Sequence, residues 1–238
     1  MMFLLPLPCS ASYRHPRVLV DRARIACCMP MVPDLTAAER LLLNDSCGLG
    51  GSTYGEITPT GFRTLMASCE LSTDDSFVDL GSGRGECVLQ AAKEFKVHHA
   101  CGMELAPSRL HIALAALEAA DVDVRSRTSF VEGDVGASTT SDILEKDSSV
   151  VWLSNLLFDD HLMQRIARLL EAARTVRCVA ALRAIAGGLD GFVEDELPVR
   201  CQMSWTKSSE ASQQYNDGHP CVIYRRVTDG WWMGRRAR

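Results

Sequence analysis

Short apolar runs alternate with amphipathic segments through the middle of the chain. The apolar runs have the length of strands, and the segments between them repeat apolar residues with the period of a helix. Because strands that alternate with helices form parallel sheets with right-handed crossovers, the pattern predicts an α/β protein. The expected strands are 77–80, 99–103, 128–132, 149–154 and 177–182, and the expected helices are 85–95, 107–120, 141–146 and 159–173, the last capped by Asp159.

Two further helices are expected before the first strand. The segment 34–44 is typical of a short helix, and the Gly- and Ser-rich residues 44–53 predict a loop. Thr58 is suited to an N-cap, with Pro59 at the first helical position. The helix that follows shows one apolar face, made of Phe62, Leu65, Met66 and Cys69.

The pattern changes after Gly191, where no further helix is expected. Segments near 197–206 and 220–227 are typical of two strands joined by a polar loop. A dehydrogenase of this type would continue with another helical unit, whereas a Rossmann-like methyltransferase ends in an antiparallel hairpin. We therefore predict a Rossmann-like, doubly wound, mostly parallel seven-stranded sheet with a C-terminal antiparallel hairpin, in one domain at 33–228.

Composition narrows the class of protein. With 238 residues, 47% of them hydrophobic and 23% charged, the chain is long enough for one domain with a substantial core. No apolar run reaches the roughly 18–20 residues that span a bilayer, so no membrane partner is expected. The ten cysteines scatter through apolar segments without a Cys-x-x-Cys pair, which indicates reduced, buried thiols and no metal site.

The net charge of −5 is unevenly distributed. Four arginines and one aspartate give residues 1–30 a charge of +3, and five arginines and one aspartate give residues 225–238 a charge of +4, so residues 31–224 carry −12. Such a body would bind DNA weakly or not at all and would attract a basic, lysine-rich substrate, although surface charge also serves solubility alone. We expect residues 1–32 to be disordered or to act in targeting, since they are loosely similar to an organelle transit peptide, and residues 229–238 to form a basic tail.

The residues from Phe77 to Glu86 carry the clearest chemical signal. An apolar run ends in Asp79, and a Gly-x-Gly-x-Gly turn then leads into a helical pattern. Glycine lets a ligand approach the backbone, and the start of the helix offers free N–H groups to an anion. Glu104 closes the next apolar segment, where a carboxylate would grip the ribose hydroxyls of a nucleotide. The chain is therefore expected to bind an adenosine-containing cofactor.

Three acids, Asp79, Glu104 and Asp134, follow three successive strands. Because the strands are expected to be parallel, these side chains should meet at one edge of the sheet, the usual ligand crevice. One acid can order the glycine turn and bind an ammonium group, one can accept two ribose hydroxyls, and one can accept the adenine amine. Each alone is also explained as a helix cap or a turn former, but three together favour a nucleotide site.

Asn155 follows the fourth strand in the segment Ser-Asn-Leu-Leu-Phe. A side-chain carbonyl at this position can hold an amine with its lone pair in line with a reacting group. An asparagine that caps the following helix explains the same position equally well. The residues alone leave both interpretations open.

Four separated blocks together resemble the Dot1 family, the non-SET histone H3 lysine-79 methyltransferases. The resemblance covers residues 50–227, and the blocks occur in the family's order. The glycine turn is shared by many class I seven-strand methyltransferases, whereas the other blocks are more specific. The four blocks are Tyr54-Gly55-Glu56, Val78-Asp79-Leu80-Gly81-Ser82-Gly83 with Gly85, Ser154-Asn155-Leu156-Leu157-Phe158, and Ser204-Trp205-Thr206.

The resemblance implies S-adenosylmethionine as the cofactor and a set of residues that bind it. Glu104 would bind the ribose, and Asp134 with Val135 would flank the adenine, where the family has an aromatic residue at the position of Val135. The loop over the cofactor would contain Tyr54, Gly55, Glu56 and Ile57, and the methionine part would lie against Asp79, Leu80, Gly81, Ser82, Gly83, Gly85 and Glu86.

The resemblance also implies where the acceptor reacts. Asn155 would stand at the methyl-transfer point, and Trp205 would line the narrow channel that admits the substrate lysine. A channel tyrosine is expected a few residues beyond Trp205, but the insertion 207–218 intervenes here. We assign this role to Tyr224, with Tyr215 as the alternative.

The resulting hypothesis is S-adenosylmethionine-dependent lysine N-methylation, with histone H3 or the nucleosome as the partner and the nucleus as the location. Family members that act on nucleosomes carry a lysine-rich flank for DNA, which this chain lacks apart from its Arg-rich ends. A class I lysine methyltransferase acting on a non-histone protein, in mitochondria or cytoplasm, therefore stays open. So do a small-molecule or nucleic-acid methyltransferase and an inactive cofactor-binding module.

Overall fold

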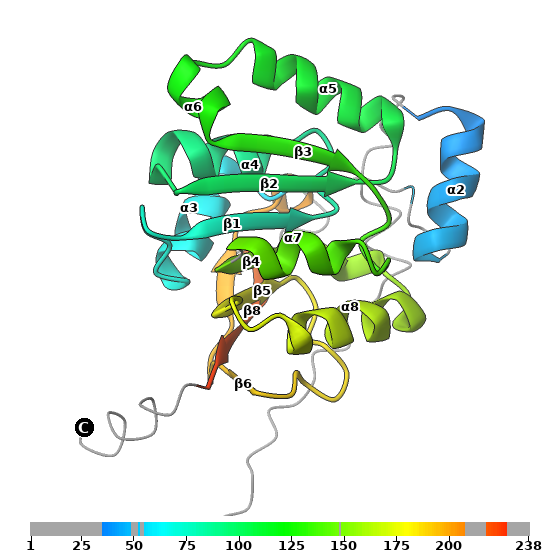
Figure 1. The fold of residues 1–238 in the computed structure, drawn as a ribbon. Coiled ribbons are helices and arrows are strands. Elements are labelled where there is room, and N and C mark those ends of the chain that lie inside the picture. Colours follow the sequence, from blue (N-terminus) through cyan, green and yellow to red (C-terminus); the bar gives the residue numbers. More distant parts are fainter. Residues whose placement is uncertain (1–34, 49–51, 53–54, 148, 208–217, 228–238) are drawn as a thin grey trace, which may run out of the picture.

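An eight-stranded sheet forms the centre of the protein. The computed structural model describes residues 35–48, 52, 55–147, 149–207 and 218–227. The strands follow the order β3-β2-β1-β4-β5-β8-β6 (Figure 1). A further strand, β7, pairs with β8 beside this path. Their bounds are β1 Ser76–Leu80, β2 His99–Glu104, β3 Thr128–Glu132, β4 Val150–Leu153, β5 Cys178–Ala181, β6 Phe192–Glu194, β7 Val199–Cys201 and β8 His219–Arg226.

The first five strands are parallel to one another. β1 pairs with β2 and β4, β3 pairs with β2, and β5 pairs with β4. Each predicted strand of this group is present, with ends within one residue of those expected. The winding direction reverses between β1 and β4, so this is the doubly wound, Rossmann-like arrangement that the sequence predicted. In such a sheet the ligand crevice lies at the carboxyl ends of the strands beside the reversal.

The last strand, β8, organises the antiparallel part of the sheet. It runs antiparallel to β5 along one edge. Along its other edge it pairs with β6 through its last residues and with β7 through its first residues. The predicted C-terminal hairpin is present as β7 and β8. The sequence did not predict β6, because its three residues are partly exposed and form no apolar run, and the sheet therefore has eight strands where seven were expected.

Helices connect the strands, and two of them begin at the caps that the sequence indicated. The Thr58 hydroxyl accepts the N–H of Gly61, and the Asp159 carboxylate accepts the N–H of Leu162. The bounds are α2 Ala37–Cys47, α3 Pro59–Ser68, α4 Glu86–Gln90, α5 Pro107–Glu118, α6 Val122–Ser126, α7 Thr140–Asp147 and α8 Asp160–Ala172, with a π-helical turn η1 Ala91–Phe95 and 3₁₀ turns η2 Asn155–Leu157 and η3 Ser204–Lys207.

Two helices differ from the prediction. α2 continues beyond the expected end at residue 44, until Gly48 ends it with a φ of 91° and donates its N–H to the carbonyl of Asn44. The start of α2 is fixed by a capping box between Thr36 and Glu39. α6 was not predicted, because five residues are too few to show a helical period.

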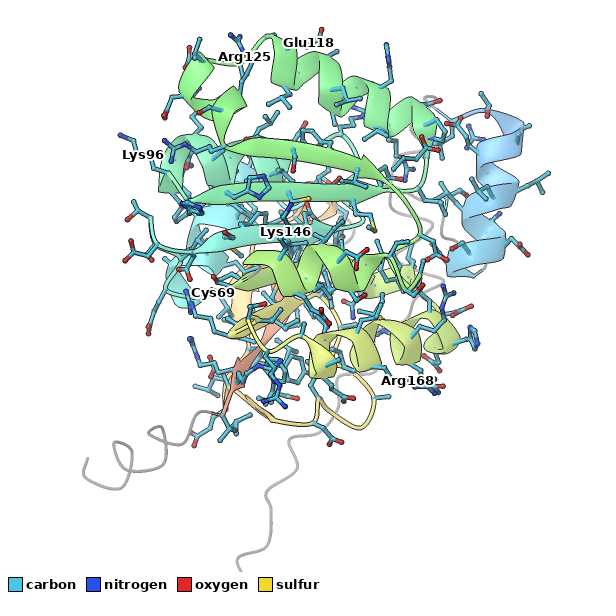
Figure 2. All side chains as sticks on the ribbon, in the orientation of Figure 1. Cys69, Lys96, Glu118, Arg125, Lys146 and Arg168 are labelled. Atoms are coloured by element: carbon cyan, nitrogen blue, oxygen red, sulfur yellow. The ribbon has the colours of Figure 1, made fainter. Side chains whose placement is uncertain are left out.

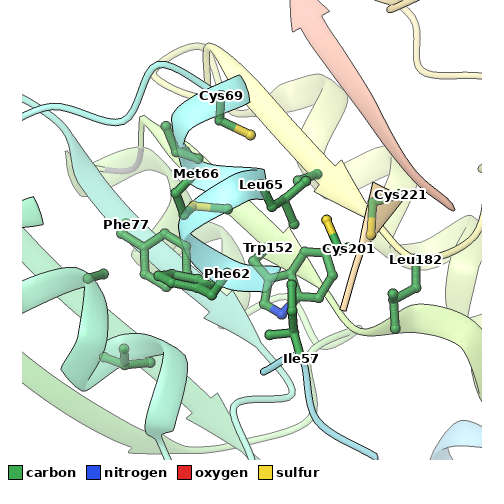
Figure 3. Packing of buried hydrophobic residues seen from close by; sticks show 14 of the residues in the cluster. Ile57, Phe62, Leu65, Met66, Cys69, Phe77, Trp152, Leu182, Cys201 and Cys221 are labelled. Carbon is green, nitrogen blue, oxygen red and sulfur yellow. The ribbon is translucent and has the colours of Figure 1, made fainter. Parts of the chain in front are cut away.

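Two apolar clusters fill the two faces of the sheet. On the face covered by α3 and α4, Phe62 packs edge to face against Phe77 with ring centres 5.5 Å apart (Figure 3). On the face covered by α7 and α8, Leu144 and Ile166 are fully buried in the second cluster. Because side chains alternate along a strand, neighbouring residues of β4 and β8 belong to different clusters.

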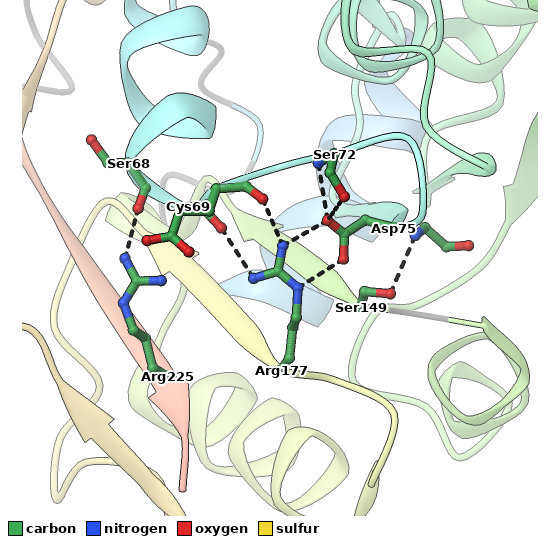
Figure 4. Close-up of polar contacts among 9 residues, drawn as sticks. Ser68, Cys69, Ser72, Asp75, Ser149, Arg177 and Arg225 are labelled. Carbon is green, nitrogen blue, oxygen red and sulfur yellow. Dashed lines mark hydrogen bonds and ion pairs between the residues drawn. The ribbon is translucent and has the colours of Figure 1, made fainter. Parts of the chain in front are cut away.

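An ion pair ties together the amino ends of β1 and β5. Arg177 donates to both carboxylate oxygens of Asp75 at 2.7 Å, and to the carbonyl of Cys69 at 3.1 Å (Figure 4). The Asp75 carboxylate also accepts the N–H of Ser72 at 2.9 Å. Burial acts to raise the pKa of Asp75, but the hydrogen bonds from Arg177 and Ser72 outweigh it, so the pKa is lowered.

Exposed basic side chains come from separate elements of the fold. Lys96 after η1, Arg125 in α6 and Arg168 in α8 lie on the periphery of the molecule (Figure 2). Within the described residues, no helix is long and apolar enough to cross a membrane. The predicted segments 1–32 and 229–238 lie outside the part of the chain that the structure describes.

Candidate functional site

A cavity lies at the carboxyl ends of the parallel strands, where the order of the sheet places a ligand crevice. It contains many of the residues that the sequence singled out. Those that line it are Gly55, Gly81, Gly83, Glu104, Asp134, Val135 and Trp205. Two acids from successive strand ends and the tryptophan of the late segment thus share one cavity.

The glycine turn after β1 is attached to β2. Its three glycines all have positive φ, from 56° to 92°, which glycine adopts without strain. The N–H groups of Gly81 and Ser82 both donate to the carbonyl of Met103 at 2.9 Å. A Cβ on Gly85 would lie 2.4 Å from the ring of Phe130, so this position has no room for a side chain. The turn therefore presents bare backbone to the cavity.

Glu104 ends β2 and is buried at the wall of the cavity. One carboxylate oxygen accepts the N–H of Gly83 and the other accepts the N–H of Ala106, each at 2.8 Å. The side chain thereby fixes both the glycine turn and the start of α5. Each carboxylate oxygen can accept a second donor, so Glu104 can also receive hydroxyl groups from a ligand.

Asp79 lies behind the glycine turn and does not line the cavity itself. Its side chain is 3% exposed, and its Oδ1 has no hydrogen-bond partner within the described residues. Burial, and then the negative charge of Glu104, raise the pKa of Asp79 to about 8. A cation bound nearby would favour the ionised form of this carboxyl.

Asp134 follows β3 and faces both the cavity and α8. Its Oδ1 accepts the N–H of Gly136 at 2.8 Å, and its Oδ2 pairs with the Arg165 guanidinium at 2.8 Å. Arg165 also donates to the carbonyl of Gly136 at 3.0 Å. The neighbouring Val135 is buried and lines the cavity with its apolar side chain. This wall combines a fixed carboxylate with an apolar surface.

The residues before α3 pair with the segment that carries Trp205. The N–H of Glu56 donates to the Ser204 hydroxyl at 3.1 Å, and the carbonyl of Glu56 accepts the N–H of Ser204 at 2.8 Å. Ile57 forms an isolated β-bridge with Met203 and is buried in the first cluster. The two blocks, far apart in the sequence, therefore form one wall.

A second acidic contact lies beside the glycine turn. Burial, and then the charge of Glu56, raise the pKa of Glu86, the first residue of α4. Two carboxyl groups thus face each other, an arrangement that a cation would stabilise. Leu80 and Ser82, predicted to touch the cofactor, are buried beside the turn and do not line the cavity. Tyr54 lies outside the described residues.

The cavity is apolar beside the ends of β4 and β5. Trp205 and Leu182 are each 2% exposed, and Leu156 and Phe158 join them in the lining. Ser154, a polar residue directly after β4, also lines the cavity. This end therefore suits an aliphatic chain that carries one polar group.

The structure places Asn155, predicted to stand at the methyl-transfer point, outside the cavity lining. Its side chain is fully buried and does not line the cavity. The amide instead joins the main chain of Arg183 by two hydrogen bonds of 2.9 Å, one donated and one accepted. The 3₁₀ turn that begins at Asn155 rotates its side chain inward and leaves Ser154 on the cavity wall.

Tyr224, predicted to line the substrate channel, does not line the cavity either. Tyr224 belongs to the second apolar cluster, on the opposite face of the sheet from Trp205. Its hydroxyl accepts the N–H of Ile185 at 2.9 Å. The residue of β8 that shares a cluster with Trp205 is Ile223. The alternative, Tyr215, lies outside the described residues.

Several cavity residues were not identified from the sequence. α2 contributes Leu43, Ser46 and Cys47, because its last turn packs over the crevice. Arg109, a buried arginine in the first turn of α5, lines the cavity and donates to the carbonyl of Ser52 at 3.0 Å. The sequence could have indicated Arg109, because it lies in the helix that follows Glu104, the residue predicted to bind the ribose.

Comparisons with known proteins agree with this geometry. The family model for "Histone methylation protein DOT1" matches residues 42–188. An H3 lysine-79 specific histone-lysine N-methyltransferase from Eremothecium gossypii is 29% identical over 133 residues, which are 51% of this chain and 22% of that protein. A protein-lysine N-methyltransferase from Saccharolobus islandicus is 35% identical over 80 residues, which are 32% of this chain and 50% of that protein.

The alignments leave much of these relatives unmatched, since this chain covers between about a fifth and a half of their length. Among solved structures, the methyltransferase domain of bacterial CtHen1-C is similar with a TM-score of 0.53 and 12% identity, covering 71% of this chain and 98% of that one. At this identity the likeness shows a class I methyltransferase fold and no more. The family match spans more than half of the 238 residues, and the chain therefore belongs to the DOT1 histone methylation family.

Proposed function

We propose that this protein is an S-adenosylmethionine-dependent protein-lysine N-methyltransferase that acts on a histone. The observation that carries the proposal is a single cavity with Glu104 and Asp134 at its polar end and Trp205 at its apolar end. The polar end suits a nucleoside, and the apolar end suits the aliphatic chain of a lysine. The substrate class is taken from the Eremothecium gossypii relative, an H3 lysine-79 specific histone-lysine N-methyltransferase.

The polar end fits S-adenosylmethionine. Glu104 would hold the ribose hydroxyls, because each of its oxygens accepts one backbone N–H and can accept another donor. Asp134 and Val135 would flank the adenine. The raised pKa values of Asp79 and Glu86 mark carboxyl groups that a positively charged ligand would stabilise. When bound, this cofactor supplies a methyl group on a positively charged sulfur.

The apolar end would prepare the acceptor amine. A lysine ammonium has a pKa of about 10.4 in water, and it must lose a proton before nitrogen can attack. Trp205 and Phe158 would exclude water and so favour the neutral amine. With Asn155 turned away, the Ser154 hydroxyl is the group proposed to orient the amine. Positioning of the amine and its removal from water would together accelerate methyl transfer.

The proposed partner is a basic protein, with histone H3 and the nucleosome as the first candidates and the nucleus as the location. The charge of −12 over residues 31–224 supports a lysine-rich partner and weak DNA binding by this part of the chain. A second candidate is a non-histone protein substrate. It is favoured by the archaeal relative, which is named as a protein-lysine N-methyltransferase without a histone.

Calorimetric titration with S-adenosylmethionine tests the cofactor proposal. Glu104→Gln should weaken binding by about 10- to 100-fold, because hydrogen bonds to a charged carboxylate are lost. Glu132→Gln is the matched control, because Glu132 is the register partner of Glu104 on β3 but is exposed. The control should bind within twofold of the wild type. Absence of binding by the wild-type protein rejects the proposal.

Transfer of label from tritiated S-adenosylmethionine tests the substrate. Core histones, nucleosomes and a cell lysate are incubated separately with the protein. A labelled H3 band supports the histone proposal, and a band on another protein alone supports the second candidate. Absence of transfer in all three, with cofactor binding intact, rejects the enzymatic assignment.

A further inference from the structure

A buried histidine joins two walls of the apolar end of the cavity. His219, the first residue of β8, is fully buried. Its Nε2 lies 3.1 Å from the carbonyl oxygen of Leu182. Its ring meets the Trp205 ring edge to face, with ring centres 6.0 Å apart and an angle of 71° between the planes. Leu182 and Trp205 both line the cavity.

The contact with Leu182 fixes the protonation of the His219 ring. A carbonyl oxygen only accepts hydrogen bonds, so Nε2 carries the ring proton and donates it. Burial lowers the pKa of His219, which keeps the ring neutral at neutral pH. A neutral ring packs against an apolar wall without the penalty of a buried charge.

Residues 182–183, which follow β5, are also held by hydrogen bonds from the β4 side. Asn155, after β4, brackets the main chain of Arg183 with its amide. The N–H of Leu182 donates to the carbonyl of Leu153 at 3.1 Å. The ends of β4, β5 and β8 therefore converge on one short segment of cavity wall, and His219 is the contribution of β8.

We propose that His219 is a positioning residue for the acceptor, because it contacts both Leu182 and Trp205 and so holds these two walls of the apolar end in place. The inference rests on the proposed function, which assigns the Trp205 end of the cavity to the acceptor. His219 does not line the cavity and acts only through these two walls. Loss of its contacts should loosen the acceptor end and leave the Glu104 end, proposed for the cofactor, unchanged.

Two substitutions separate the two contacts. His219→Phe keeps a ring against Trp205 and removes the donor to Leu182. His219→Gln keeps an N–H donor and removes the ring. His99→Phe is the matched control, because His99 also makes a side-chain hydrogen bond, 3.2 Å to the Ser129 hydroxyl, but lies at the amino end of β2 and away from the cavity.

The measurements are the dissociation constant for S-adenosylhomocysteine, and KM and kcat with tritiated S-adenosylmethionine and core histones. Both His219 variants should raise KM for histones at least fivefold, while the dissociation constant stays within twofold of the wild type. The control should match the wild type throughout. If His219 served stability alone, its variants would raise KM and the dissociation constant together, or they would lower only the fraction of active protein. Unchanged KM and kcat in both variants overturn the inference while leaving the proposed function intact.

Hydrogen–deuterium exchange gives a readout that needs no substrate. Amides of residues 182–186 should exchange at least tenfold faster in His219→Phe, which lacks the donor to Leu182, than in the wild type and in the His99→Phe control. Equal exchange overturns the inference. If the wild-type protein labels no histone, the proposed function fails on that result, and the exchange data still decide whether His219 holds the wall.

Discussion

The Asp79→Asn substitution tests whether the carboxyl behind the glycine turn is protonated in the folded protein. Burial, and then the charge of Glu104, raise the pKa of Asp79 from 3.8 to about 8. The carboxyl therefore binds its proton more tightly in the folded state than in the unfolded chain. This tighter proton binding contributes to the free energy of unfolding. The contribution is fully present below pH 4 and is lost as the pH rises through 8.

The size of the loss follows from this change in proton affinity. A rise from 3.8 to about 8 is equivalent to about 6 kcal/mol, at about 1.4 kcal/mol for each tenfold change in proton affinity. Water entry and relaxation around a buried charge reduce the measured effect, so we expect about 3 kcal/mol between pH 5 and pH 9. The amide of the variant does not titrate and escapes this loss. The variant should match the wild type to about 1 kcal/mol at pH 5 and exceed it in stability at pH 9.

Urea unfolding of both proteins at each pH from 5 to 9 measures the difference in their free energies of unfolding. Subtracting the wild-type free energy of unfolding from that of the variant cancels the contribution of every other titrating group, because the two proteins differ at one position. A difference that stays constant across this range would refute the reasoning, since it would mean that Asp79 is already ionised at pH 5.

Three further substitutions have outcomes set by the geometry. Arg177→Met should lower the free energy of unfolding by about 3 kcal/mol, because it leaves the Asp75 carboxylate, 9% exposed, without its ion pair; urea unfolding measures this. Asn155→Ala removes two 2.9 Å hydrogen bonds and should destabilise by about 2 kcal/mol, while calorimetry shows cofactor affinity within twofold. Gly85→Ala places a Cβ 2.4 Å from a phenylalanine ring of β3, and calorimetry should show no cofactor binding by this variant. The control is Gly187→Ala, which also has a positive φ, 90°, but has open space around it. The control should lose about 1 kcal/mol of unfolding free energy and bind the cofactor normally.

Much of the fold could be predicted because its signals are local. Each parallel strand is an apolar run that stops at an acid, a glycine or a polar cluster, and caps such as Thr58 and Asp159 mark helix starts by their own side-chain chemistry. β6 and α6 were missed because three and five residues carry no measurable period. The extent of α2 depended on Gly48, one of several glycines in a run that offered no way to choose among them.

The residues of the site that could be predicted are those at the ends of parallel strands, because the direction of the strand decides where they lie. Glu104 is the last residue of β2 and Asp134 lies two residues past the end of β3, so both reach the same edge of the parallel sheet. Whether Ser154 or Asn155 lines the cavity could not be predicted, because a 3₁₀ turn begins at Asn155 and no local pattern indicates which of the two residues faces the cavity. The face of the sheet that Tyr224 occupies could not be predicted, because the insertion before β8 hides the strand register that decides it.

The contribution of α2 and β8 to the cavity has a practical consequence for where an active fragment can begin and end. The family match starts at residue 42, inside α2, and stops at residue 188, before β6, β7 and β8. A protein trimmed to that match would lose the capping box of α2 and the strand that shields the outer edge of β5. It would also lose Trp205. We therefore expect a stable, active fragment to need at least residues 35–227, which extend beyond the residues matched by the family model on both sides.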